Sequence, residues 1–216
     1  WTDCSEDVEL IEQSPPGEVS EALPQSLAEP VVAGYIHRIT LYALGLQYLD
    51  VPQHWYSLDD QQLELVAKAF PKRYDVAQPD LYVDARLFRE WRCPNSCTGE
   101  NHDFIDALVK DRRFGKWLRE FKGVLDAEDR HFIPGGACTI AVCCKAGINR
   151  SIGCCRVLEH VLTSSGFLVD IIWLSKPQID RRRICYKCAH CRYGRFQTHK
   201  KACALDDAFR LWQTLC

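Results

Sequence analysis

One stretch of this 216-residue chain has the residue types of a phosphate-binding loop: Cys144, Lys145, Ala146, Gly147, Ile148, Asn149, Arg150 and Ser151. Successive backbone N–H groups of residues 145–150 can point inward and hold an anion, and Gly147 permits the turn. Arg150 supplies a planar, two-pronged donor for phosphate oxygens, while Ser151 can either cap the next helix or hydrogen-bond the Cys144 sulfur. The stretch therefore predicts a site for a phosphorylated small molecule.

Cys144 at the base of this loop gives the site a candidate nucleophile. A helix N-terminus and Arg150 would both favour its thiolate, which can attack phosphorus. A phosphatase working this way also needs an acid to protonate the leaving oxygen. Asp103, just ahead of a helix predicted over 104–121, is the first candidate acid and Asp84 is the second. The simplest alternative is a plain strand-turn-helix, in which Cys144 is a small buried apolar residue.

The elements around the loop are a predicted strand before it and a predicted helix after it. Residues 137–143 form a short apolar, β-branched run, which is typical of a buried strand of a parallel sheet. From Ile152 to Leu162 apolar residues recur at helical spacing, and Ser164-Ser165-Gly166 ends the pattern. The loop would then stand at the carboxyl end of a strand and at the N-terminus of a helix, where an anion is favoured.

A strand predicted between residues 80 and 88 adds charged residues to the site. Asp84 and Arg86 lie on one face of it, and in an open α/β sheet ligands bind at the carboxyl ends of the strands. The two side chains would either line the mouth of the phosphate site or form a structural ion pair. Together these elements predict an α/β fold, a small and mostly parallel sheet flanked by helices.

The whole chain divides into four predicted regions. Residues 1–30, rich in Glu, Ser and Pro, are expected to be a disordered acidic lead-in. Residues 31–78 are expected to be a helical extension, with one helix over 31–49 and another from Ser57 to Phe70. The phosphate-binding domain follows over 79–180. Residues 181–216 form a Cys/His-rich appendage that ends in a helix over 204–215.

Metal-ligand residue types cluster in that last region, at Cys185, Cys188, Cys191, His199 and Cys203. Their paired spacing is typical of a small structural Zn²⁺ site, and the preferred four are Cys188, Cys191, His199 and Cys203. A closed tetrahedral site of this kind leaves no position for catalysis. The alternative is a cysteine-rich surface helix that holds no metal.

Basic and aromatic residues surround the Cys/His cluster, among them Arg181-Arg182-Arg183, Lys200 and Lys201. On a zinc knuckle such residues can bind RNA or single strands. A solvated rim is the more ordinary interpretation, because one patch of this size rarely establishes nucleic-acid binding. An RNA-binding adaptor is therefore the second alternative function, after the phosphatase.

The composition limits which partners and which cellular compartment the sequence predicts. The net charge of −2 predicts no overall attraction to nucleic acid or acidic membranes, and no apolar run is long enough for a membrane span. The 13 cysteines, several of them adjacent in predicted buried elements, favour an intracellular, cytoplasmic reducing compartment over a secreted disulfide scaffold. The start at Trp1 and the absence of methionine suggest a fragment from which a targeting segment could have been removed. The sequence does not indicate the oligomeric state.

The loop resembles that of the dual-specificity branch of the cysteine-dependent protein phosphatases, which often reads Cys-x-Ala-Gly-Ile-x-Arg-Ser. Residues Cys144 to Ser151 match this pattern, whereas Cys143 stands where those enzymes have a histidine. The resemblance covers only about one strand-helix unit around the loop. It implies a phosphatase with Cys144 as the nucleophile and Arg150 as a phosphate ligand.

A longer stretch, from about residue 80 to 176, resembles the C-terminal domain of the RNase adapter protein RapZ. That family's loop reads Cys-Thr-Gly-Gly-x-His-Arg-Ser and binds an amino-sugar phosphate. Tyr82 to Leu87 is similar to its opening strand, and Thr98-Gly99 precedes a helix in the same order. Lys145, Ala146 and Asn149 depart from the family's loop. The resemblance implies a regulatory or sensor domain for a sugar phosphate or a nucleotide.

Overall fold

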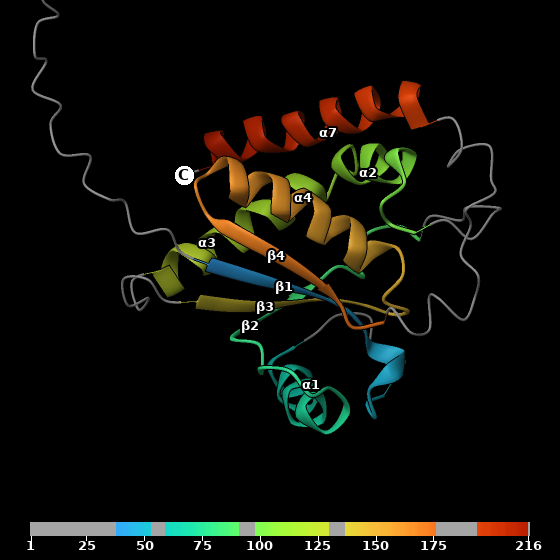
Figure 1. Cartoon of the computed structure of the whole chain (residues 1–216). Coiled ribbons are helices and arrows are strands. Elements are labelled where there is room, and N and C mark those ends of the chain that lie inside the picture. The colour runs from blue at the N-terminus through green and yellow to red at the C-terminus, as the bar shows by residue number, and fades with distance from the viewer. Residues whose placement is uncertain (1–37, 53–58, 91–97, 130–136, 176–193, 216) are drawn as a thin grey trace, which may run out of the picture. The chain divides into compact units, whose positions relative to one another are not determined.

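The computed structural model describes residues 38–52, 59–90, 98–129, 137–175 and 194–215. All of these lie in the compact unit that residues 35–216 form. Its centre is a four-stranded parallel sheet with the strand order β2-β3-β1-β4 (Figure 1). The strands are β1 (Arg38–Gly45), β2 (Leu81–Asp84), β3 (Ala137–Cys144) and β4 (Leu168–Trp173). The predicted α/β class, a small parallel sheet flanked by helices, is confirmed.

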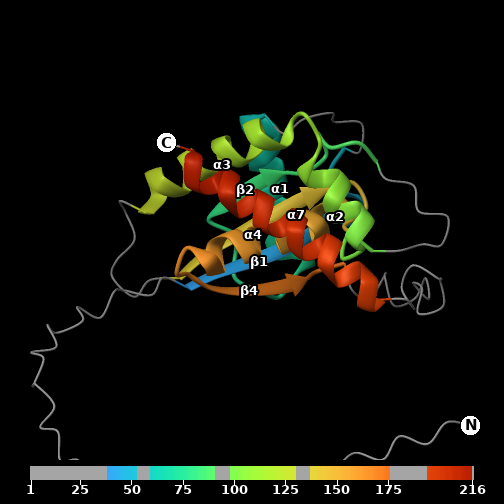
Figure 2. The same cartoon turned by 90° about the horizontal axis from the view of Figure 1, so that it is seen from above.

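Helices cover both faces of the sheet. Figure 1 shows α1 (Asp60–Arg73) below it, and α2 (His102–Val109), α4 (Arg150–Ser164) and α7 (Gly194–Thr214) above it. In the view of Figure 2, α7 lies across α4, and it packs against α2, α4 and α3 (Phe114–Asp129). Each face of the sheet has its own apolar core, and the smaller one lies between the sheet and α1. Within the described segments, no helix combines the length and the apolar character that crossing a membrane requires.

The region predicted as a helix over 31–49 contains the central strand, so that prediction was wrong. β1 pairs with β3 from Arg38↔Ala137 to Gly45↔Cys144, and with β4 on its other side. Only the short 3-10 turn Leu46–Tyr48 follows it. A strand buried on both faces has a near-continuous apolar run, which also fits a helical period. The expected helical extension therefore supplies the middle of the sheet; residues 31–37 lie outside the described part.

The second helix of that region is present as α1. Its N-cap is Asp59, whose carboxylate accepts the backbone N–H of Gln62 at 2.9 Å, while Asp59 N–H donates to the Gln62 side chain at 3.3 Å. This reciprocal capping box starts the helix two residues after the predicted Ser57. The helix runs through Pro71 to Arg73, slightly past the predicted end.

The helix predicted over 104–121 is two helices, because the chain turns at Asp111. The Asp111 carboxylate accepts the backbone N–H of Arg113 at 2.9 Å, and its carbonyl accepts that of Phe114 at 2.8 Å. An aspartate that bonds nearby backbone groups competes with continuation of a helix. The break separates α2 from α3, and α2 can therefore pack next to the site independently.

Candidate functional site

The predicted loop connects the end of β3 to the start of α4, at the edge of the sheet where all four parallel strands end. Gly45, at the end of β1, comes so close that an added Cβ would lie 2.6 Å from the backbone carbon of Ala146. On the β2 side, Ala85 N–H donates to the Cys143 carbonyl at 2.8 Å. Ligands of open α/β sheets bind at this edge. The strand-loop-helix order expected from the sequence is thus present, with the neighbouring strand ends packed around it.

Gly147 makes the loop turn. Its φ is +66°, a left-handed value that side-chain-bearing residues rarely adopt. An added Cβ would lie 2.2 Å from Ser175 Oγ and 2.6 Å from the Gly45 nitrogen. The residue must therefore be glycine both for its backbone conformation and for lack of space.

Three of the five carbonyls of residues 145–149 accept hydrogen bonds from other parts of the chain. Lys145 O accepts Gln47 N–H at 3.0 Å, Ile148 O accepts Gly99 N–H at 3.1 Å, and Asn149 O accepts Gly153 N–H at 2.8 Å. Of the amides of residues 145–149, the one with an acceptor among the described residues is that of Gly147, which donates to Cys144 Sγ at 3.1 Å. The other four amides are left for a partner from outside. This is the backbone arrangement that binds anions.

The Cys144 sulfur has two hydrogen-bond partners, the Gly147 N–H that donates to it and the Ser151 hydroxyl oxygen. Besides the Gly147 N–H, the Ser151 hydroxyl oxygen is 3.3 Å away, and Cys144 and Ser151 are both buried. The structure thus selects between the two predicted roles of Ser151: it contacts the sulfur, while the N-cap of α4 is Asn149. Burial raises the pKa of the neighbouring Cys143, Cys154 and Cys155 thiols well above the usual value, so they stay protonated.

Arg150 is anchored to the end of β2. Its Nη1 donates to the carbonyl oxygens of Arg86 at 3.0 Å and Phe88 at 3.3 Å. Its Nε and Nη2 have no acceptor among the described residues. A guanidinium held by one nitrogen keeps its planar orientation, so the others stay ready for phosphate oxygens.

Asp84 and Arg86 bind each other and so form the ion pair that is one of their two predicted roles. Arg86 Nε and Nη2 donate to the two carboxylate oxygens at 3.0 and 2.9 Å, and the Arg86 backbone N–H adds a bond at 2.8 Å. The side chains are 8% and 19% exposed for Arg86 and Asp84. Because Arg86 O holds Arg150, the pair fixes the anchor of the loop arginine.

Asp103, the first candidate acid, is placed in the first turn of α2. Its backbone N–H is capped by Asn101 at 2.8 Å, and its carboxylate contacts Lys200 Nζ on α7 at 2.7 Å and His102 Nε2 at 3.1 Å. These contacts fit the alternative role of Asp103, an ordinary negative charge that stabilises the N-terminus of a helix.

Two of the predicted metal ligands fall in the described part of the chain, and they touch. His199 and Cys203 lie one turn apart on α7, with Nδ1 and Sγ 3.1 Å from each other. Cys185, Cys188 and Cys191 lie outside the described residues. The described residues by themselves bring no three metal-ligating side chains together. The zinc prediction thus rests on this pair and on the spacing of the rest.

Of the two described lysines of the basic segment, Lys200 is already paired with carboxylates. Lys200 bonds to Asp103 and Asp106 at 2.7 and 3.3 Å, and burial lowers the pKa of Lys201. Arg181-Arg182-Arg183 lie outside the described residues. Phosphate contacts by unpaired basic side chains dominate nucleic-acid affinity, so these observations do not add support for an RNA-binding adaptor.

Sequence reasoning missed three residues that shape the loop. Gly45 and Gly99 give it room: an added Cβ at Gly99 would lie 1.9 Å from Asn149 O. Ser175, fully buried just after β4, has a hydroxyl with no partner among the described residues. The signal for Gly99 was its place just ahead of a helix, whereas Gly45 and Ser175 had no signal.

Comparison with protein-family models, with curated proteins and with solved structures gives no match. The resemblances to the RapZ C-terminal domain and to the dual-specificity phosphatases therefore stay predictions that rest on the quoted residues.

Proposed function

We propose that this chain binds a phosphorylated small molecule, a nucleotide or a sugar phosphate, in a regulatory or sensing role. The observation that carries the proposal is the loop backbone of residues 145–149, in which three carbonyls are bonded to the chain and four amides are left without a partner among the described residues. Helix α4 starts at Arg150 and adds its N-terminal dipole at the same place. Backbone amides, a helix N-terminus and an arginine together favour a phosphate group over a neutral ligand.

The residues around the loop favour binding of a phosphorylated ligand over its hydrolysis. Cys143 occupies the position of the phosphatase histidine, and its thiol is kept protonated by burial. Asp103 is held by Lys200. A site that binds the phosphate but lacks a ready proton donor for the leaving oxygen would release its ligand intact.

Replacing Arg150 by alanine is expected to weaken phosphate binding about 10- to 100-fold, since a hydrogen bond to a charged group is worth roughly 1.5–3 kcal/mol. The measurement is the thermal unfolding midpoint of the reduced protein against inorganic phosphate, with chloride added to hold the ionic strength constant. Arg112→Ala removes an exposed arginine outside the site and should behave like the wild type. Equal midpoints of the wild type in phosphate and in chloride would contradict the proposal.

The alternative function, a cysteine-dependent phosphatase, is favoured by one specific observation: Cys144 Sγ accepts an amide hydrogen bond and contacts the Ser151 hydroxyl. In that reaction the thiolate forms an S–P bond while the P–O ester bond breaks, and the leaving oxygen takes a proton. Water then cleaves the S–P bond and releases phosphate.

This alternative predicts that Cys144→Ser abolishes hydrolysis of a generic aryl phosphate under reducing conditions. A serine hydroxyl has no comparable tendency to ionise, so turnover should fall to the background rate. Ser151→Ala, which removes only the contact to the sulfur, should leave partial activity. Turnover that survives in Cys144→Ser would rule out the mechanism, and no turnover in the wild type would leave the binding function alone.

We also propose structural Zn²⁺ for the His199 and Cys203 pair, completed by cysteines of the preceding segment. Protein purified without chelator is expected to contain about one zinc per chain by elemental analysis, since such sites use four ligands. Cys203→Ala should lose the metal and lower the unfolding midpoint, whereas Cys138→Ala, which lies in β3, should keep the metal. Metal-free wild type would overturn this assignment.

A further inference from the structure

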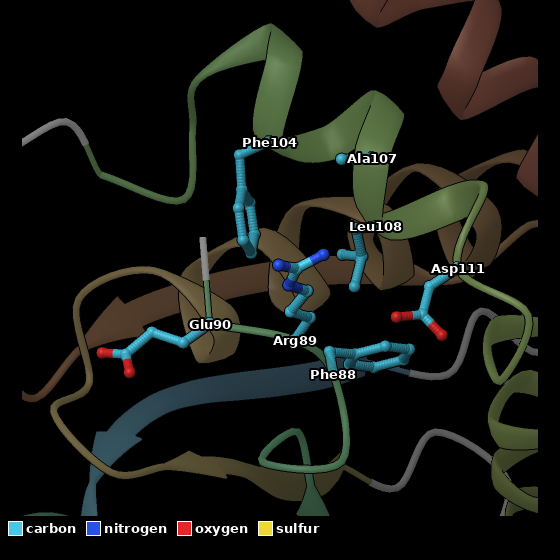
Figure 3. A pocket seen from close by; sticks show the side chains of 7 residues that line it. All are labelled: Phe88, Arg89, Glu90, Phe104, Ala107, Leu108 and Asp111. Atoms are coloured by element: carbon cyan, nitrogen blue, oxygen red, sulfur yellow. The ribbon is translucent and has the colours of Figure 1, made fainter. Parts of the chain in front are cut away.

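A cavity of about 690 Å³ lies between α2 and the segment that follows β2 (Figure 3). The residues that line it are Phe88, Arg89, Glu90, Phe104, Ala107, Leu108 and Asp111. Its size falls in the range of roughly 300–1,000 Å³ that small-molecule sites occupy. The phosphate-binding role does not by itself use this cavity.

The cavity adjoins the loop on two sides. Arg150 Nη1 donates to the carbonyl of Phe88, a lining residue, at 3.3 Å. Phe104, another lining residue, packs on the first turn of α4, where an added Cβ at Gly153 would lie 2.3 Å from its ring. Phe88 and Phe104 therefore line the cavity and also contact Arg150 and the first turn of α4.

The walls of the cavity are apolar. Phe88, Phe104 and Leu108 are buried residues of the larger core, so their positions are fixed by packing. The Asp111 carboxylate is already occupied: Arg113 Nε and Nη2 donate to it at 2.9 and 2.7 Å, which lowers the pKa of Asp111 to about 2. It has little capacity to bind a further polar group.

Arg89 and Glu90 are the polar side chains left for a ligand. Both are exposed, and neither makes an ion pair with another described residue. Figure 3 shows the Arg89 guanidinium between Phe104 and Leu108, with Glu90 extending to the other side. The cavity thus offers apolar walls, one planar cation and one carboxylate at its rim.

We propose that this cavity holds the base of a nucleotide whose phosphate occupies the loop. A flat heteroaromatic ring can stack on aromatic side chains and on an arginine plane. The Arg89 guanidinium, which Figure 3 shows between Phe104 and Leu108, supplies the plane on which the ring stacks. A sugar would bury several hydroxyls against apolar walls without partners, which costs free energy. The inference rests on the proposed function and selects the nucleotide over the sugar phosphate.

The test compares the affinities of AMP, GMP, ribose 5-phosphate and inorganic phosphate for the wild type and Ala107→Trp by titration calorimetry. Ala107 is an exposed residue of α2 at the cavity wall, so tryptophan should fill the cavity without unfolding the protein. At least one nucleotide is expected to bind the wild type ~10-fold or more tightly than ribose 5-phosphate, as stacking predicts. Ala107→Trp should abolish this preference and leave inorganic phosphate binding unchanged.

Two results would overturn the inference in different ways. If phosphate and ribose 5-phosphate bind but neither nucleotide binds more tightly, or if Ala107→Trp keeps the preference, the cavity is not a base site and the phosphate site stands. If none of the four ligands binds the wild type, the proposed function fails and the base site fails with it. Arg150→Ala should weaken all four ligands, whereas Arg89→Ala should weaken the nucleotides alone.

Discussion

Gly147→Ala is expected to lower the free energy of unfolding by about 4 kcal/mol and to abolish phosphate binding. The left-handed backbone at φ +66° costs a residue with a side chain roughly 1–2 kcal/mol. The added methyl would also lie 2.6 Å from the Gly45 nitrogen, which belongs to a buried strand and cannot easily move. Overpacking of this kind adds about 1–3 kcal/mol. Urea unfolding of the reduced protein measures the sum.

Gly166 provides the matched control for this prediction. Its φ is +96°, but an added Cβ has no atom within 4 Å. Gly166→Ala should therefore show the backbone cost alone, about 1–2 kcal/mol, with normal phosphate binding. If Gly147→Ala is no more destabilising than Gly166→Ala, the close packing of the loop against Gly45 and Ser175 is not present in solution.

Asp84→Ala should destabilise the protein by about 3 kcal/mol and weaken phosphate binding as well. The Arg86 side chain is only 8% exposed, so Asp84→Ala breaks a buried ion pair, which is strongly destabilising. The same change loosens the segment whose carbonyls hold Arg150. Denaturant unfolding measures the loss of stability, and the shift of the thermal unfolding midpoint by phosphate measures the loss of phosphate binding.

The exposed ion pair between Arg38 and Asp170 serves as the comparison. Its side chains are 64% and 51% exposed, and exposed pairs contribute at most about 1 kcal/mol. Asp170→Ala should therefore have a small effect on stability and none on phosphate binding. Similar losses in Asp84→Ala and Asp170→Ala would show that burial does not strengthen the Asp84 pair.

The local part of the site could be predicted from the sequence. A β-branched apolar run, a small-residue turn and a helical period follow each other directly, so β3, the loop and α4 are fixed by neighbours in the chain. Gly147 and the contact of Ser151 with the Cys144 sulfur belong to the same local unit. Such features need no knowledge of the rest of the fold.

The features that the sequence did not reveal depend on segments far apart in the chain. Gly45 meets the loop only because β1 pairs with β3 in a register that sets Gly45 opposite Cys144. The anchoring of Arg150 on the carbonyls of Arg86 and Phe88 requires that β2 lie at the sheet edge beside β3. The mistaken helix over 31–49 has the same origin, because the central position of β1 is what gives it two apolar faces.

The position of β1 also bears on how the chain is made. This strand is synthesised well before both of its partners, since it ends at Gly45 while β3 begins at Ala137 and β4 at Leu168. Pairing across such separations requires closure of long loops and slows assembly. Until β3 and β4 emerge from the ribosome, an apolar strand has no native neighbour and is prone to aggregation. The yield of folded protein should therefore depend on chaperone protection of the nascent chain at least as much as on final stability.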